Sequence, residues 1–191
     1  MKTVKTLFII GLLMAVPLSG KAQKEGKEEK VGGIRLGYHA AALYKDGNKM
    51  AGTNNLENFY IGIFRDNKIA PLFRIGTGLE YFQNGAKIDD DNKLVLHTLS
   101  IPVNFKVKLG PVFVLTGVGA NFKVSEKVFL NGTSTTPSDE DKSNFFDIPF
   151  YLGAGAKIWF ISIEARYHWG LLDVNEGYSN QYLQIGAAVS F

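Results

Sequence analysis

Apolar and polar residues alternate along residues 181–191. Small or polar residues separate five apolar ones, at Leu183, Ile185, Ala187, Val189 and Phe191. Because successive side chains of a β-strand point to opposite faces, this pattern predicts a strand with one apolar face and one small or polar face. Such a segment is typical of the closing strand of a membrane barrel.

Seven further stretches show the same alternation, and polar segments divide them. The eight predicted strands cover residues 33–44, 57–65, 69–82, 94–109, 112–124, 145–158, 161–170 and 181–191. Each is near or above the ~9–11 residues that a tilted membrane strand needs. No stretch reaches the about 18 consecutive apolar residues of a membrane helix, and no apolar stripe repeats at the helical period. The chain is therefore predicted to be all-β.

One face of these strands collects charged side chains and glycines, while the other carries Ile, Val, Leu and aromatic residues. Ten charged residues fall on the polar face: Arg35, Arg74, Glu80, Lys106, Lys108, Lys123, Asp147, Lys157, Glu164 and Arg166. A soluble lipocalin-type barrel has an apolar lining and a polar exterior, which is the inverse pattern. An apolar exterior around a polar lumen is the arrangement of membrane barrels.

The connections support this assignment. Gly110-Pro111 and Trp159-Phe160 each join an odd-numbered to an even-numbered apolar stripe, which requires an even-length turn, and Asp66-Asn67-Lys68 joins two odd stripes. These short turns alternate with long loops at about residues 45–56, 83–93, 125–144 and 171–180. The predicted fold is an eight-stranded antiparallel transmembrane β-barrel with short periplasmic turns and longer extracellular loops.

Residues 1–22 are predicted to be a cleaved export signal. Lys2 and Lys5 precede the apolar run 7–16, and small residues stand before Gln23. Residues 23–32 then form a flexible periplasmic lead-in, and residues 33–191 form the barrel domain. These segments predict a location in the cell outer membrane. The expected partners are outer-membrane lipid and the barrel assembly machinery, which would read the C-terminal strand ending at Phe191.

Charge excludes one class of partner. The chain has 21 basic and 18 acidic residues, and the predicted signal removes Lys2, Lys5 and Lys21 but no acid. The remaining chain is balanced at 18 against 18, since 21 minus 3 is 18. No nucleic-acid partner is therefore expected.

Several segments resemble a known family. They are Ala22-Gln23 at the signal end, Leu99–Lys106 in a pattern like L-x-I-P-V-x-x-K, a G-x-G segment before Ser162–Leu171, and the closing strand Tyr182–Phe191. These are similar to landmarks of the PorT-like outer membrane protein β-barrel family, which is frequent in Bacteroidota. The resemblance implies a barrel without shared catalytic residues, and a role as a secretion accessory.

The ten inward charges are expected to fill the lumen. The interior of an eight-stranded barrel is just wide enough for side chains, so we expect a plug of ion pairs. Lys157 should stand opposite Ser162 and diagonal to Glu164, within reach of an ion pair. Seven cations face three carboxylates, and this excess leaves room for bound anions or water.

Other candidate sites are weaker. His39 and His168 point inward without the third ligand that Zn²⁺ needs. His97 lies on the outer face, where a lipid-modifying enzyme would need a base, but Ser100 has the wrong parity to be its nucleophile. Asp89–Asp91 has oxygen ligands suited to Ca²⁺, although acidic loop tips are usually only solvated. No catalytic, cofactor or metal site is predicted, and Ca²⁺ binding at Asp89–Asp91 stays open.

The sequence therefore predicts a structural or anchoring barrel that displays surface loops and has no enzymatic activity. The alternatives are an accessory or partner-binding barrel in secretion or adhesion, with an unidentified extracellular or envelope protein as partner, and a lipid-modifying outer-membrane enzyme. The longest loop, Glu126–Asn144, is rich in Ser, Thr, Asp and Asn, which suits partner contact.

Overall fold

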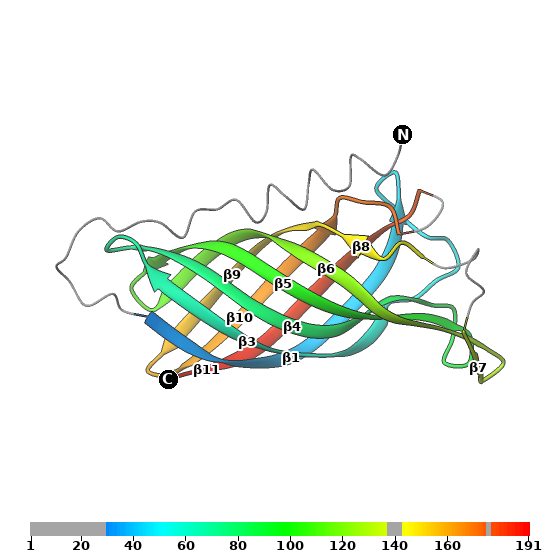
Figure 1. The fold of residues 1–191 in the computed structure, drawn as a ribbon, viewed down its shortest axis with the longest axis horizontal. Helices are drawn as coiled ribbons and strands as arrows, with labels where there is room; N and C mark the ends of the chain where they lie inside the picture. Colours follow the sequence, from blue (N-terminus) through cyan, green and yellow to red (C-terminus); the bar gives the residue numbers. More distant parts are fainter. Residues whose placement is uncertain (1–29, 137–142, 175–176) are drawn as a thin grey trace.

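The chain forms a closed antiparallel barrel of eight long strands (Figure 1). The computed structural model describes residues 30–136, 143–174 and 177–191. The barrel strands are β1 (Lys30–Lys45), β3 (Leu56–Lys68), β4 (Phe73–Lys87), β5 (Lys93–Leu109), β6 (Val112–Leu130), β9 (Pro149–Ile158), β10 (Ile161–Gly170) and β11 (Ser179–Ser190). Each strand pairs with the next, and β11 pairs with β1 from Gly33↔Ser190 to Tyr44↔Ser179. This last pairing removes both sheet edges.

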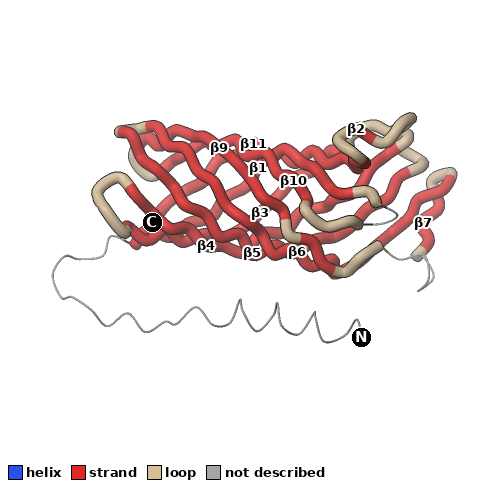
Figure 2. Tube along the Cα trace, turned by 90° about the horizontal axis from the view of Figure 1, so that it is seen from above, coloured by secondary structure: helices blue, strands red, loops and turns tan. Residues whose placement is uncertain are grey.

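The two ends of the barrel differ. At one end, here called the turn end, the connections are residues 69–72, 110–111 and 159–160. At the other, the loop end, the connections carry three small strands, β2 (Asn48–Lys49), β7 (Thr133–Thr135) and β8 (Phe146–Asp147). Figure 2 shows β2 and β7 together at the loop end, with the C-terminus at the turn end.

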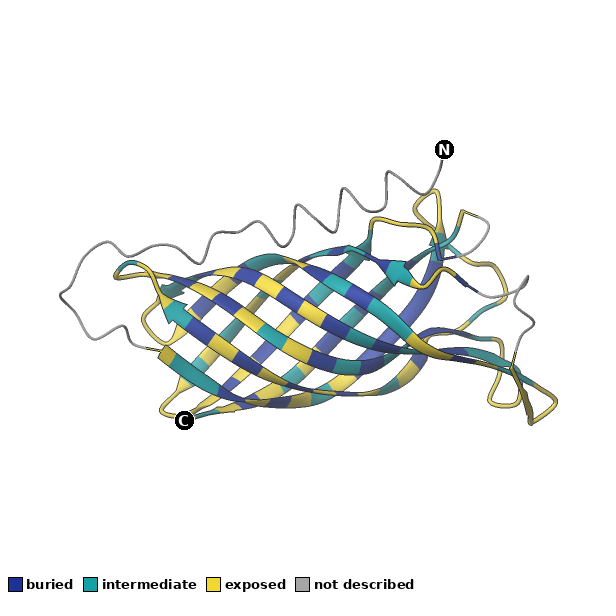
Figure 3. Ribbon diagram, in the orientation of Figure 1, coloured by how far each residue is buried: buried dark blue, intermediate teal, exposed yellow. Residues whose placement is uncertain are grey.

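Side chains alternate between buried and exposed along the strands, as Figure 3 shows across the whole barrel. The pattern in β10 is representative: Ser162, Glu164 and Arg166 are buried, while Ile161 and Ile163 are exposed. Leu36, Phe59, Ile61 and Ile63 are among many large apolar residues that face outward. A continuous apolar exterior is the surface that lipid would cover, so the predicted facing of the strands is confirmed.

Aromatic residues border this apolar band at both ends. Phe73 stacks on Phe105 near the turn end, with ring centroids 5.4 Å apart. Nearer the loop end Phe150 stacks on Trp169 at 6.0 Å, and Phe122 packs on Phe146 at 5.2 Å. Aromatic rings at two levels are the girdles that membrane barrels place at the lipid–water boundaries.

Two of the predicted turns are confirmed. Leu109 pairs with Val112 and Ile158 pairs with Ile161, so Gly110-Pro111 and Trp159-Phe160 are the turn residues. Gly110 has a φ of 67° and Trp159 a φ of 57°. Left-handed backbone is common in tight hairpins, but it is unusual for a residue such as tryptophan.

The third predicted turn is wrong. Asp66, Asn67 and Lys68 lie inside β3, where they pair with residues 74–76 of β4. The turn lies at residues 69–72 and is held by a hydrogen bond from the Phe73 amide to the Ala70 carbonyl, 3.1 Å long. Both apolar stripes remain odd because the last pair, Lys68 and Arg74, encloses five residues, which is an odd number.

Several strand boundaries also differ from the prediction. β1 begins at Lys30, where three residues assigned to the lead-in pair with β3. β4 continues to Lys87 and β5 begins at Lys93, so the predicted loop 83–93 is shortened to residues 88–92. β6 continues to Leu130 and so includes the start of the predicted loop 125–144. The predicted signal, residues 1–22, and the first part of the lead-in lie outside the described residues.

Among the residues that the structure describes, no helix has the length and apolar character needed to cross a membrane.

Candidate functional site: the charged lumen

Four charged side chains meet in the middle of the lumen. Arg166 binds Glu80 through two bonds, Nη1–Oε1 at 2.8 Å and Nη2–Oε2 at 3.2 Å. Arg35 donates to Glu80 Oε1 at 3.2 Å and to Glu164 Oε1 at 3.1 Å, and Arg166 Nε lies 3.4 Å from Glu164. All four side chains are at most 3% exposed. This central cluster is a closed square of two guanidinium groups and two carboxylates.

Inward-facing glycines make room for the cluster. A Cβ placed on Gly62 would lie 2.6 Å from Glu80 Cγ, and one on Gly153 would lie 2.8 Å from Arg166 Cγ. Both positions pair directly with the charged residue concerned, Gly62 with Glu80 and Gly153 with Arg166. A side chain at either position would displace the ion pair, which explains why glycine and charge share one face of the sheet.

A layer of stacked rings lies on the loop-end side of the cluster. His168 stacks on Tyr182 at 4.2 Å and on Tyr151 at 4.5 Å, and His39 stacks on Phe82 at 4.7 Å. All five side chains are buried. These rings fill the bore where the central cluster ends.

The two luminal histidines belong to this packed layer. His39 contacts Asn84 Oδ1 through Nε2 at 3.1 Å, and Gln184 Nε2 through Nδ1 at 3.2 Å. Among the described residues no group of three or more His, Cys, Asp or Glu side chains is placed to hold a metal ion. His168 is thus packed between the Tyr151 and Tyr182 rings, and the side-chain amides of Asn84 and Gln184 hold the His39 ring.

The remaining predicted lumen residues lie nearer the two ends. Arg74, Lys106 and Asp147 are buried, and Lys108, Lys123 and Lys157 are partly buried. Lys106 pairs with Asp66 at 2.6 Å at the turn end. Asp147 Oδ1 accepts a bond from the Leu172 amide at 3.3 Å near the loop end.

The expected pairing of Lys157 with Glu164 is wrong. Lys157 does stand opposite Ser162, but its Nζ donates to Ser190 Oγ at 2.8 Å. Glu164 is engaged by Arg35 and Arg166 instead. Arg166 lies two residues from Glu164 on the same strand and Arg35 reaches Glu164 from β1, whereas Lys157 extends toward Ser190 at the turn end.

Two luminal carboxylates were not predicted. The sequence pattern predicts a turn at Asp66, yet Asp66 is buried in β3 and pairs with Lys106. The sequence pattern predicts a loop at Glu126, yet Glu126 is buried in β6, where it pairs with Lys123 and accepts hydrogen bonds from the Ser143 amide and hydroxyl. With these two acids, the seven cations of the predicted set face five carboxylates, so the positive excess falls from four to two.

The fold has counterparts among solved structures. Ail, the attachment invasion locus protein of Yersinia pestis, in complex with the heparin analogue sucrose octasulfate, is 16% identical, with a TM-score of 0.54 over 85% of this chain and 99% of that chain. Neisserial surface protein A is 13% identical, with a TM-score of 0.55 over 87% of this chain and 100% of that chain. The chain has the fold of a bacterial outer-membrane β-barrel.

A further solved structure has the same barrel fold. The outer membrane protein Ail in a phospholipid bilayer nanodisc matches with a TM-score of 0.50 at 16% identity, over 85% of this chain and 100% of that chain. Identity at this level shows the fold and leaves function to the site. A scan against protein-family models finds no match. A search of curated proteins finds none either.

The outer face of the barrel carries the histidine considered as a catalytic base. His97 Nδ1 is 2.6 Å from the Tyr81 hydroxyl on the neighbouring strand, and the two rings stack. Ser100 is buried on the luminal face. The His97 imidazole and the Ser100 hydroxyl therefore lie on opposite faces of β5, so Ser100 is not placed to act as a nucleophile with His97 as its base.

The acidic loop is organised by its own hydrogen bonds. Asp89 Oδ1 accepts from the amides of Asp91 and Asn92 at 2.9 and 2.7 Å, and the Asn92 side chain also donates to it. These bonds, chiefly the one from the Asn92 side chain, hold the pKa of Asp89 below its usual value. Asp90 pairs with Lys87 at 3.2 Å. The carboxylates of Asp89 and Asp90 are thus used within the loop.

Proposed function

We propose that the protein resides in the outer membrane, has a closed lumen and no catalytic activity, and acts through the surface at its loop end. In this orientation the short turns face the periplasm and the loops face outward. Lipid covers the exposed apolar face of the strands. Export by the predicted signal and insertion by the barrel assembly machinery, with β11 as the closing strand, are part of this proposal.

One observation carries the proposal: at the loop end, part of the sheet extends beyond the barrel as an arm with regular strand structure. β4, β5 and β6 continue beyond the pairing of the other strands and, with β7, form an arm of residues 86–95 and 124–135 (Figure 1). Its two hairpin tips are bound together, by the Asn131 amide to Asn92 Oδ1 and the Gly132 amide to the Asp91 carbonyl, both at 3.1 Å. An element that only joined strands would not need this bracing.

The arm also presents apolar surface. Ile88 and Leu130 are both 59% exposed, beside the charged residues of the acidic loop. Exposed apolar side chains rimmed by charge are characteristic of protein interaction sites. We therefore infer that the arm contacts a protein partner.

The test compares two double variants in cells that lack the native gene. Ile88→Asp with Leu130→Asp removes the apolar surface of the arm, and Ile69→Asp with Leu72→Asp changes two exposed apolar residues at the turn end as a control. We expect the arm variant to reproduce the deletion phenotype in adhesion or secretion assays while its barrel still shifts in gel mobility on boiling. The control variant should restore the wild-type phenotype. Full complementation by the arm variant would place the function in the barrel wall.

A second prediction concerns transport. The central cluster and the ring layer occupy the bore, and eight strands enclose little more than their own side chains. The purified barrel should show no steady, porin-sized conductance in planar bilayers, whereas a porin prepared in the same way should show regular steps. Steady large steps from this barrel would move its function towards that of a channel.

Secretion is a second candidate process. The resemblance of Leu99–Lys106 and Ser162–Leu171 to PorT-like proteins favours an accessory of protein secretion, and the secretion assay above addresses it.

The heparin analogue bound by Ail is a polyanion, whereas the arm of this chain mixes Asp89, Asp90 and Asp91 with Lys93 and Lys127. The mixed charge of the arm does not favour the same class of ligand.

A further inference from the structure

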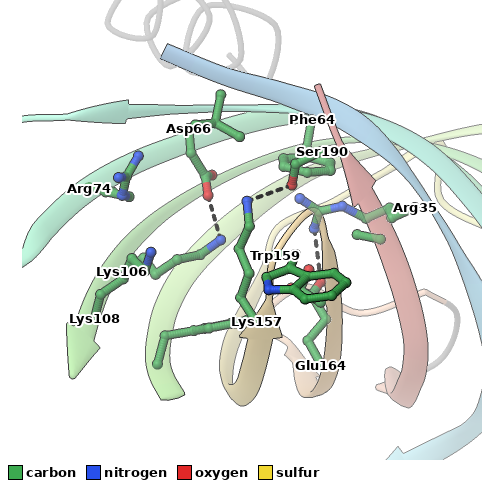
Figure 4. A pocket seen from close by; sticks show the side chains of 14 residues that line it. Arg35, Phe64, Asp66, Arg74, Lys106, Lys108, Lys157, Trp159, Glu164 and Ser190 are labelled. Atoms are coloured by element: carbon green, nitrogen blue, oxygen red, sulfur yellow. Dashed lines mark hydrogen bonds and ion pairs between the residues drawn. The ribbon is translucent and has the colours of Figure 1, made fainter. Parts of the chain in front are cut away.

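The lumen contains a cavity of about 300 Å³ at the turn end, on the opposite side of the central cluster from the ring layer. Every barrel strand contributes to its walls, and Figure 4 shows the charged side chains that point into it. The charged lining residues are Arg35, Asp66, Arg74, Lys106, Lys108, Lys157 and Glu164. Five cations and two carboxylates give this small space a net charge of three positive.

Both carboxylates of the cavity are already engaged. Asp66 Oδ2 lies 2.6 Å from Lys106 Nζ, and Glu164 Oε1 lies 3.1 Å from Arg35 Nη1. Glu164 also lies 3.4 Å from Arg166 of the central cluster. Of the other lining cations, Lys108 and Lys157 contribute positive charge that neither of these two carboxylates offsets through a direct contact.

Two of these cations lack an acidic partner. Lys157 Nζ donates to the neutral Ser190 hydroxyl at 2.8 Å. For the Lys108 ammonium group the described part of the chain provides no hydrogen bond or ion pair, although the Lys108 backbone amide donates to the Leu72 carbonyl at 2.8 Å. Like charges confined in a partly desolvated space repel more strongly than they would in water. An anion in the cavity would remove this repulsion and accept hydrogen bonds from the ammonium groups.

Aromatic rings in the walls hold two of the cations in place, and the cavity reaches the surface at the turn end. The Arg35 guanidinium lies 4.5 Å from the Phe64 ring centroid, and Lys106 Nζ lies 4.8 Å from that of Phe113. Trp159, at the mouth, is 87% exposed. Since the central cluster closes the other side, a ligand would enter from the turn end and pass Trp159.

We propose that the turn-end cavity is a binding site for a phosphate group. A doubly charged oxyanion matches the two cations that lack an acidic partner, Lys108 and Lys157, and its oxygens accept from Lys and Arg donors in several directions. The phosphate can belong to a free ion, such as inorganic phosphate or pyrophosphate, or to the headgroup of an anionic phospholipid beside the barrel rim.

Trp159 supplies the readout. The chain has two tryptophans, and Trp169 lies far away in the aromatic girdle near the loop end, so Trp169→Phe leaves one reporter at the cavity mouth. In this background the folded protein in maltoside micelles, which contain no phosphate, is titrated with phosphate, with pyrophosphate, and separately with phosphatidylglycerol. Sodium chloride at matched ionic strength is the control for screening.

We expect a saturable change in Trp159 fluorescence together with a rise in Tm. Lys108→Gln should weaken binding by at least about tenfold, since a charge-assisted hydrogen bond is lost. Lys127→Gln, at the loop end, should bind as the parent does. Without phosphate, Lys108→Gln should be as stable as the parent or more stable, because repulsion is relieved; a lysine with a purely structural role would give a loss of stability.

The two ligand series identify the source of the phosphate. Saturation by pyrophosphate or phosphate alone assigns the site to a free ion, and saturation by phosphatidylglycerol alone assigns it to a lipid headgroup. Either result supports the proposal if Lys108→Gln weakens the binding of that ligand. The proposal is overturned if no series saturates, if sodium chloride gives the same change, or if Lys108→Gln binds as tightly as the parent.

Discussion

Glu80→Gln is expected to lower the free energy of unfolding by about 3–5 kcal/mol, the usual cost of removing one partner from a buried ion pair. Glu80 accepts two bonds from Arg166 and one from Arg35. The variant would leave two buried guanidinium groups with Glu164 as the one carboxylate of the cluster. Equilibrium unfolding in urea, followed by the gel shift of the folded barrel in lipid vesicles, measures the change.

Glu57→Gln is the matched control, because Glu57 is an exposed glutamate on the neighbouring strand β3. Its substitution should change stability by no more than about 0.5 kcal/mol. Adding Arg166→Met to Glu80→Gln should recover part of the loss, since one guanidinium group, Arg35, then faces the one remaining carboxylate, Glu164. If Glu80→Gln unfolds like the control, the central cluster contributes no stability to the barrel.

The period of the pattern explains why the facing of the strands could be predicted. A two-residue repeat assigns each side chain to the lumen or to lipid without any knowledge of the neighbouring strands. Arg35, Glu80, Glu164 and Arg166 were therefore correctly placed inside. The same reasoning says nothing about their height along the barrel axis, and height decides which charges meet.

Partner choice shows this limit. Glu80 and Arg166 are 86 residues apart in the chain and meet because the strands are tilted and staggered around the barrel. Lys157 and Glu164 are near neighbours across a confirmed turn, yet they do not pair. The pairing of adjacent strands predicts only diagonal contacts between neighbouring side chains, whereas long side chains in a narrow lumen can bind partners on the opposite wall.

The two missed carboxylates have separate physical causes. Asp66-Asn67 has the composition of a turn, but pairing with β4 continues past it and the turn forms at residues 69–72. In β6 the register shifts between the pairs Lys123–Thr98 and Ser125–His97, so Val124 has no partner. This bulge moves Glu126 from the outer to the luminal face.

Val103→Arg is expected to destabilise the folded barrel in bilayers by about 2–4 kcal/mol, the cost of a lipid-facing arginine near the bilayer midplane. Val103 is 42% exposed on the outer face of β5. It lies between the stacked pair Phe73 and Phe105 on the turn-end side and Tyr81, which pairs with Leu99, on the loop-end side. The depth of this position follows from the two aromatic levels.

Leu109→Arg tests depth on the same face of the same strand. Leu109 is 56% exposed, but it lies at the turn end, where an arginine can reach the lipid headgroups and should cost no more than about 1 kcal/mol. Urea unfolding of both variants in vesicles of one lipid composition gives the difference. Equal penalties would mean that the apolar band does not follow the two aromatic levels. A larger penalty at Leu109 would place the bilayer centre nearer the turn end, at the level of the turn-end cavity.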